Sequence, residues 1–525
     1  MRGRSALIFI LVAGQAGLSA QTARLDQPKK QAVAHSIPRK SEADLAAERR
    51  RAKALDILQR SHALNGQITD RQKGSLLAVQ ISVAANLDKE LTLQWARELF
   101  DFGFSLNPEA GGRAQVSAIR SLADANPDEA LAMLSRMEPA FLEPSPQDFP
   151  ADSLFNHKLE MAFRSYAEKK GKPGLIEILS TATVLGDKGR YPYSGVMSAT
   201  QTFRDPQLST KVASALVTRF CTRVDSPITA ADFAKMLIEN ERSIPYRLLK
   251  PAVDAAAQAL QNYPQNDDNK RYYATMNFAK GESITAHGPA EISLLRLAPL
   301  LKRVDPELAD QIAEKFSILK DPASSKDWKA GGGGTMTMGF DGNKQASQPD
   351  QRDVILSEVW KLMWQEPAKA EQLMASIPEA SLRAEAYAYA AQQLSSHDPA
   401  RAARYAEQAQ QTSSEVEDSM IKFRSLVAKL QGDAANGRRV EVAQELEPVF
   451  RAANQLMRKA VDEKMDTSEI VQLLRDPVKE AAKLEPDLTA ANIDTVSFPF
   501  ERASLLTAAA SGLVSAAPAR PPNGN

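Results

Sequence analysis

The sequence predicts an all-α fold in which helical hairpins stack into an α-solenoid, a right-handed superhelix. Three observations support this prediction. Helix-forming segments follow one another from Ser41 onward, apolar residues recur in them at helical spacing, and a proline-based helix-start motif recurs along the chain. Alternating β-branched runs separated by hairpin turns are almost absent, so we expect no sheet.

The first three helices show the helical signals in detail. Ser41 and Asp44 form a capping box, and Asn65–Gly66 ends the helix that follows. Asp70 and Asp88 are expected to cap the next two helices. The third helix carries one apolar face, formed by Leu91, Trp95, Leu99, Phe102 and Leu106.

A helix-start motif recurs along the chain: a capping residue, a proline, and an alanine three positions after the proline. The capping side chain accepts free N–H groups of the first turn, and proline suits the first helical position. Because alanine is small, each copy predicts a helix that packs closely against the helix before it. The copies are Asn126-Pro127 with Ala130, Asp305-Pro306 with Ala309, Glu366-Pro367 with Ala370, Asp398-Pro399 with Ala402, and a looser Asp205-Pro206 with Ser209.

The segment from Glu366 to Gln411 resembles a tetratricopeptide repeat. Ala390, Ala402 and Ala409 match the small positions of that family's two helices. The segment lacks the family's aromatic and glycine marks in the first helix, and Ser414 stands where the closing proline would be. The resemblance implies a tetratricopeptide-like superhelix with a concave surface that binds a protein or peptide, and it implies no chemistry.

A glycine-rich segment interrupts the helical pattern at residues 320–350. It contains Gly331–Gly334, without the lysine that a phosphate-binding loop needs. Since so long a loop is uncommon inside a compact domain, we expect it to separate two lobes. The expected organisation is a signal peptide (1–20), a polar linker (21–40), an N-terminal helical-repeat lobe (41–319), a flexible loop (320–350), a C-terminal helical-repeat lobe (351–515) and a disordered tail (516–525).

The N-terminal residues have the order of a secretory signal peptide. Arg2 and Arg4 precede a short apolar run, and small residues follow up to Ala20. The run is too short for a membrane-spanning helix. Cleavage after Ala20 would leave Gln21 where a bacterial lipoprotein carries its lipidated cysteine. We therefore expect a soluble, exported bacterial protein without a lipid anchor, in the periplasm or outside the cell.

Charge and cysteine content restrict the classes of partner. Lys and Arg together number 65, as do Asp and Glu, which argues against a nucleic-acid partner. Residues 21–55 are the one basic stretch, with nine basic and four acidic residues. A solvated linker or a contact with an anionic membrane surface accounts for it. Cys221 is the sole cysteine, and we expect a buried, inert thiol.

No residue pattern predicts a catalytic, cofactor or metal site. Glu282–Ser283 resembles the Glu-Ser pair of lytic transglycosylases, but that family's later Gly-Leu-Met-Gln segment is missing. Ser317 and Lys320 have the spacing of penicillin-recognising enzymes without the two further elements of that family. His157 and Glu160 lie one helical turn apart, which is too few ligands for zinc.

Four aromatic residues are the candidates for partner contacts. Trp360 and Trp364 are neighbours on one helix, and Tyr191 and Tyr193 flank a proline in a turn between helices. The tryptophan helix is apolar around most of its circumference, so burial in the core is the preferred interpretation there. The tyrosines are expected to be exposed.

The leading interpretation is a non-enzymatic, exported scaffold that binds a protein or peptide through its concave surface, with no cofactor. The alternatives are a cell-envelope enzyme acting on cell-wall polymer, similar to lytic transglycosylases, and a structural spacer. An enzyme depends on a few positioned groups, whereas a solenoid spreads its binding over several repeats.

Overall fold

The computed structural model describes residues 41–138, 154–223, 227–263, 272–277, 283–326, 335–340 and 351–515. The expected signal peptide (1–20), linker (21–40) and tail (516–525) lie outside these ranges. Within them the chain forms 22 α-helices and three strands, which confirms the all-α prediction. None of the helices described is long and apolar enough to cross a membrane.

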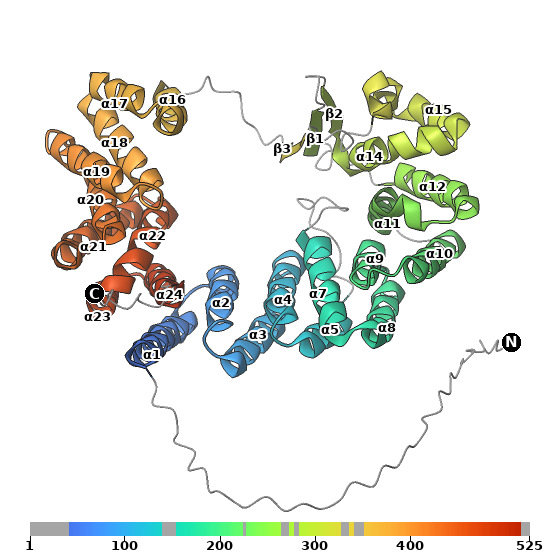
Figure 1. Cartoon of the computed structure of the whole chain (residues 1–525), viewed down its shortest axis with the longest axis horizontal. Coiled ribbons are helices and arrows are strands. Elements are labelled where there is room, and N and C mark those ends of the chain that lie inside the picture. The colour runs from blue at the N-terminus through green and yellow to red at the C-terminus, as the bar shows by residue number, and fades with distance from the viewer. Residues whose placement is uncertain are drawn as a thin grey trace, which may run out of the picture.

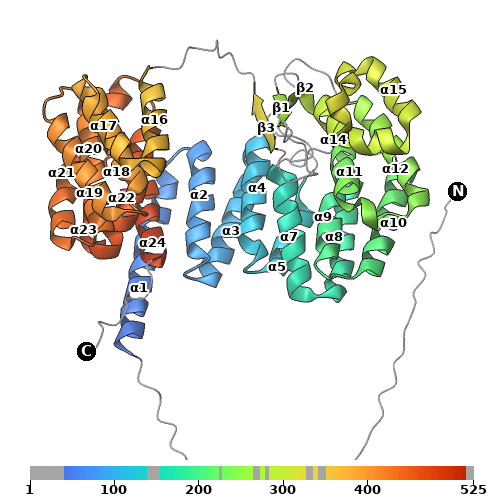
Figure 2. The same cartoon turned by 45° about the horizontal axis from the view of Figure 1, so that its top comes forward.

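The helices alternate between an inner and an outer row of a broad arch (Figure 1). The inner row contains α2 (Asp70–Ala84), α4 (Pro108–Ala123), α7 (Leu154–Lys170), α9 (Tyr193–Gln201), α11 (Pro227–Asn240), α14 (Gly288–Val304), α16 (Gln351–Gln365), α18 (Ala380–Leu394), α20 (Ser419–Ala435), α22 (Ser468–Leu484) and α24 (Pro499–Ser515). The outer row contains α1 (Glu42–Ala63), α3 (Lys89–Gly103), α5 (Pro127–Arg136), α8 (Leu175–Asp187), α10 (Pro206–Thr222), α12 (Tyr246–Gln261), α15 (Pro306–Lys315), α17 (Pro367–Ser376), α19 (Pro399–Ser413), α21 (Arg439–Asp462) and α23 (Pro486–Asp494). Figure 2 shows the helices standing side by side, with α1 reaching below its neighbours.

The first and last helices of the chain pack against each other within the arch. Along the inner row the contacts run from α16 through α18, α20, α22 and α24 to α2, and then through α4, α7, α9 and α11 to α14. Helix α1 of the outer row packs on α24 of the inner row. Ser61 Oγ of α1 donates to the Ala503 carbonyl oxygen at 2.7 Å and lies 2.8 Å from Thr507 Oγ1.

One apolar core runs through this contact between the chain ends. It extends from Ala54 in α1 to Leu513 in α24 and includes the helices on both sides. The segments 41–319 and 351–515 therefore share a core at α1 and α24. The arch opens instead between the α14–α15 hairpin and α16, which are neighbours in sequence (Figure 1).

The proline motif begins helices, as expected, and these helices belong to the outer row. The capping residues of α5, α15, α17 and α19 have φ between −144° and −140° and ψ between 72° and 83°. The alanines three residues after these prolines are at most 2% exposed, so each helix start packs closely. A copy not expected from the sequence begins α23, where Glu485 precedes Pro486 and the buried Thr489 takes the place of the alanine.

A three-stranded antiparallel sheet, which was not expected, lies at one end of the array. Its strands are β1 (Tyr272–Asn277), β2 (Ser283–His287) and β3 (Thr335–Phe340), in the order β2-β1-β3. Thr275 pairs with Thr285 on one side and with Thr337 on the other. Ala274 and Ile284 belong to a small core that the sheet forms with α14.

The expected loop at 320–350 is thus partly regular structure, which corrects its boundaries. It includes strand β3 and a 3-10 helix, and Gly331–Gly334 lies outside the described ranges. The 3-10 helices are η1 (Leu64–Gln67), η2 (Lys172–Gly174), η3 (Glu241–Ser243), η4 (Ser317–Lys320) and η5 (Pro322–Ser325).

Candidate functional site

Three adjoining hollows follow the inner row from α16 to α4. The first, of about 760 Å³, lies among α16, α18, α20 and α22. The second, of about 440 Å³, lies among α22, α24 and α2, and the third, of about 660 Å³, lies between α2 and α4. Gln472 and Asp476 line both the first and the second hollow, while Val79 and Ser82 line both the second and the third. Together they form one surface, the inner groove, which crosses the junction of the chain ends.

Trp360 and Trp364 line one side of the first hollow. They are 42% and 41% exposed, which corrects the preferred interpretation that they lie in the core. Val359 and Met363 occupy the buried face of α16 instead. The sequence could not separate the two faces, because α16 is apolar on both.

Four aromatic rings form a row, here called the aromatic row, of which Trp360, Trp364 and His397 line the hollow. The rings of Trp360 and Trp364 are 5.9 Å apart at an interplanar angle of 75°. Tyr389 of α18 lies 6.3 Å from Trp360, and His397, just after α18, lies 5.2 Å from Trp364. The edge-to-face packing of Trp364 against Trp360 and His397 fixes these rings while leaving part of each tryptophan open to solvent.

Amide and hydroxyl side chains line the first hollow together with the aromatic row. Gln431 Nε2 of α20 donates to Ser395 Oγ at 2.8 Å, and Ser395 Oγ donates to the Gln392 carbonyl oxygen at 2.8 Å. The side chains of Gln392 and Gln393 also line the first hollow. Since each amide carries both donors and an acceptor, this surface can pair with either kind of backbone group of a ligand.

Charged residues of α22 line the opposite side of the first hollow. Its lining includes three carboxylates, Glu469, Asp476 and Glu480, and one ammonium group, that of Lys483. Lys483 pairs with Glu480 at 2.6 Å, and Lys479 pairs with Asp476 at 2.9 Å. Pairs within one helix and near solvent contribute little to stability, so these carboxylates can exchange partners at low cost.

A chain of ion pairs connects the four inner-row helices around the first hollow. Arg352 of α16 pairs with Glu385 of α18, Nε to Oε2 at 2.7 Å. Glu385 also pairs with Arg424 of α20, which in turn pairs with Glu469 of α22. The buried Glu385 carboxylate is paired with both Arg352 and Arg424. We therefore expect this series of ion pairs to hold α16 at a set distance from α22.

The second hollow depends on a close approach between α22 and α24. A Cβ atom at Gly512 would lie only 2.2 Å from the backbone oxygen of Lys479. Any larger residue would therefore push the two helices apart. The side chain of Lys479 and the neighbouring Ser511 both line this hollow.

Tyr191 and Tyr193 are buried, which corrects their assignment as exposed partner contacts. They are 5% and 0% exposed. The ring of Tyr193 packs 5.5 Å from Phe220 and 5.0 Å from Phe233, and the guanidinium of Arg219 lies 4.1 Å from the ring centre of Tyr191. The turn was placed correctly, but nothing near it in sequence indicated that α10 and α11 would cover it.

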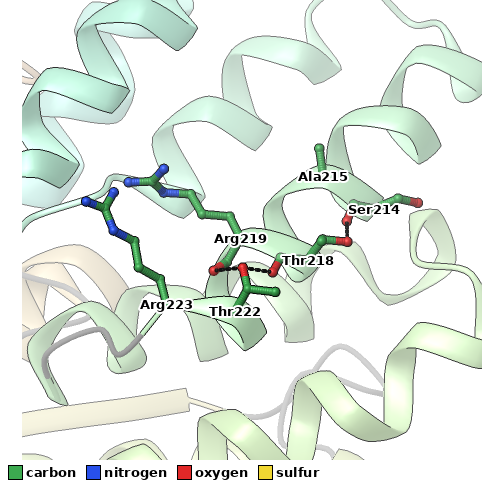
Figure 3. A pocket seen from close by; sticks show the side chains of 6 residues that line it. All are labelled: Ser214, Ala215, Thr218, Arg219, Thr222 and Arg223. Carbon is green, nitrogen blue, oxygen red and sulfur yellow. Dashed lines mark hydrogen bonds between the residues drawn. The ribbon is translucent and has the colours of Figure 1, made fainter. Parts of the chain in front are cut away.

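A further hollow lies on the surface of α10 (Figure 3). Its lining comes from this helix and from Arg223, which directly follows it, and the side chains of Arg219 and Arg223 extend in the same direction. Thr218 and Thr222 donate their hydroxyl protons to carbonyls one turn earlier, at 2.9 and 2.7 Å. Because the hydroxyls already bond their own helix, we assign no site here.

Cys221 of α10 is exposed, which corrects the expectation of a buried thiol. Its Sγ lies 3.7 Å from the Pro251 carbonyl oxygen, and desolvation raises the pKa of the thiol. A raised pKa keeps the thiol protonated at neutral pH, so the cysteine is still expected to be unreactive.

The residues considered for chemistry either lie outside the described ranges or are engaged apart from one another. Glu282 and the side chain of His157 lie outside the described part of the chain. Ser317 is exposed in η4, and Glu160 pairs with Lys235 of α11 at 2.5 Å. Among the residues with described positions, no three His, Cys, Asp or Glu side chains are placed to share a metal ion.

The fold and the inner groove define the class: an all-α protein with an extended surface on its inner row. A comparison with models of known protein families gave no match, and none of the curated proteins compared was similar.

Proposed function

We propose that this chain is an exported α-solenoid, tetratricopeptide-like in architecture, that binds a protein or peptide in its inner groove. The continuity of the groove is the observation that supports this proposal most. Adjoining hollows that share lining residues on α22 and on α2 offer an extended ligand one uninterrupted surface across the chain-end junction.

The regular spacing of contacts between neighbouring units supports the solenoid architecture. Arg97 of α3 pairs with Glu129 of α5 at 2.9 Å, and Arg404 of α19 pairs with Glu371 of α17 at 3.1 Å. Each pair joins successive outer-row helices, as expected for stacked repeats in which each unit contacts its neighbours. The nearly identical backbone angles at the starts of α5, α15, α17 and α19 support the same architecture.

In this proposal the two expected lobes act together. The segment 41–319 contributes α2 and α4 to the groove, and 351–515 contributes α16, α18, α20, α22 and α24. The contact between α1 and α24 therefore has a direct role, because it aligns the two parts of the groove. Export, with removal of residues 1–20, would place this surface in the periplasm or outside the cell.

Blocking the groove at its middle tests the proposal. Ser82 is exposed on α2 and lines both the second and the third hollow. The larger side chain of Ser82→Arg should therefore fill the place where these two hollows meet. The matched control is Ile176→Arg on the outer helix α8, where the side chain is 73% exposed.

Both variants would be exported, checked for helicity by circular dichroism and used to capture partners from the native envelope. We expect Ser82→Arg to lower capture by tenfold or more and Ile176→Arg to leave it unchanged. Equal capture by the wild type and Ser82→Arg would rule out the groove as the binding surface.

A further inference from the structure

We propose that the first hollow of the inner groove binds a proline-rich peptide segment carrying a basic residue, supplied by a partner protein. This inference rests on the proposed function and specifies the chemical class of the ligand. It follows from three groups of residues around the hollow: the aromatic row, the amides and the carboxylates of α22.

The aromatic row suits prolines that recur at a fixed interval. Neighbouring ring centroids are 5.2 to 6.3 Å apart, and the two tryptophans meet nearly at right angles. A polyproline II helix advances about 9 Å per turn of three residues, so prolines one turn apart can contact different rings of the row. The partly exposed faces of Trp360 and Trp364 offer the flat apolar surface that such prolines pack against.

The amides favour an extended ligand over a helical one. A bound helix already satisfies its own backbone groups, so Gln392 and Gln393 would lose water without gaining partners. The backbone of a polyproline II segment has no internal hydrogen bonds, so its carbonyl oxygens can accept from these amides. Addition of a β-strand is not available here, because helices make up the whole hollow.

The carboxylates of α22 account for the basic residue. This side of the hollow presents three carboxylates, of which Glu469 is already held by Arg424 of α20. Asp476 and Glu480 pair with Lys479 and Lys483 of the same helix, and pairs of this kind exchange partners at low cost. An arginine of the ligand could therefore form charge-assisted hydrogen bonds with them.

The chain itself carries a sequence of this chemistry, Pro518-Ala519-Arg520-Pro521-Pro522, after the end of α24. This segment lies outside the described residues. From α24 to α16 there are four steps along the inner row, about 32–40 Å at ordinary helix spacing. Seven residues, from Ser515 to Pro522, span at most about 25 Å even when fully extended, which is shorter than this path. A partner protein is therefore the expected source of the ligand.

The test uses a fluorescent peptide of residues 516–525 as the probe and the whole mature chain as the receptor, with binding followed by anisotropy. We expect saturable binding that weakens at least tenfold with Trp364→Ala in the receptor or with Arg520→Glu in the probe. The control receptor, Tyr246→Ala, changes an aromatic residue of the outer helix α12 that is 90% exposed, and should bind normally. Glu480→Gln should weaken binding and reduce its dependence on salt.

Three outcomes would overturn the inference. The first is probe binding that Trp364→Ala and Arg520→Glu leave unchanged. The second is binding of a chitin oligosaccharide, but not of the probe, with loss in Trp364→Ala, which would assign the hollow to a glycan. The third is probe binding only to a chain that ends at Ser515, which would make the chain's own tail the occupant. In each case the inner groove itself is judged separately, by the effect of Ser82→Arg on partner capture.

Discussion

Gly512→Ala is expected to destabilise the protein, although alanine is the better helix former. Inside an unobstructed helix the same change stabilises by about 0.5–1 kcal/mol. At Gly512, however, the added Cβ would lie 2.2 Å from the Lys479 oxygen and 2.8 Å from its carbonyl carbon and Cα. The sign of the effect therefore separates local helix propensity from the packing of α22 against α24.

The magnitude follows from how far the two helices must move. Real Cβ atoms essentially never approach another atom more closely than 3.0 Å, so α22 and α24 must separate by about 0.8 Å here. The obstacle is backbone, which cannot rotate away as a flexible side chain would. Overpacking of this kind costs about 1–3 kcal/mol, and after subtracting the propensity gain we expect a net loss of up to about 2.5 kcal/mol, with a midpoint of about 1 kcal/mol.

Urea unfolding and hydrogen exchange of α22 and α24 measure this effect. The matched control is Gly66→Ala, where an added Cβ would meet nothing within 4 Å. The control should be neutral or more stable by up to about 1 kcal/mol. If Gly512→Ala proves as stable as Gly66→Ala, with unchanged exchange in α22 and α24, the close approach of the two helices is wrong.

Four further predictions follow from the same structure. Limited proteolysis between Lys326 and Lys344 should give two fragments that elute together from a sizing column, because α1 packs on α24; separate elution would contradict the shared core. Burial raises the pKa of Asp232, so the folded chain holds that proton more tightly than the unfolded chain, and stability should fall as pH rises above the ordinary pKa of 3.8. Asp232→Asn should reduce this fall in urea titrations from pH 4 to pH 7, and an unchanged slope would contradict it. Ala402→Asp buries an unpaired charge in the fully buried start of α19, and should abolish partner capture and lower helicity by circular dichroism. Glu282→Gln should leave capture unchanged, whereas its loss in a folded variant would favour the enzyme alternative.

Features that act within one helical turn could be predicted from the sequence. Ser41 and Asp44 form the expected capping box, and the Asp88 side chain accepts from two N–H groups of α3. The helices expected after Asp305 and Asp398 begin at the following prolines. These signals succeed because cap and proline act on neighbouring backbone atoms, whatever packs around them.

Features that depend on distant segments could not be predicted. Tyr193 is buried because Phe220 and Phe233 cover it, and Trp360 stays partly exposed because α16 turns Val359 to the core instead. The sheet pairs β1 with β3 across more than fifty intervening residues, and β3 is too short to stand out in the sequence. Nothing near Ser61 indicates that it would bond to Ala503 at the other end of the chain.

Site-specific photo-crosslinking in the native envelope tests most directly the claim that the inner groove is the binding surface. A photoreactive side chain would be placed in turn at Gln472 and Val79 in the groove, and at the exposed outer positions Ile176 and Tyr246. The groove proposal predicts partner adducts from Gln472 and Val79 and none from the two outer positions. Adducts from Ile176 or Tyr246 alone, or equal yields from all four, would contradict it.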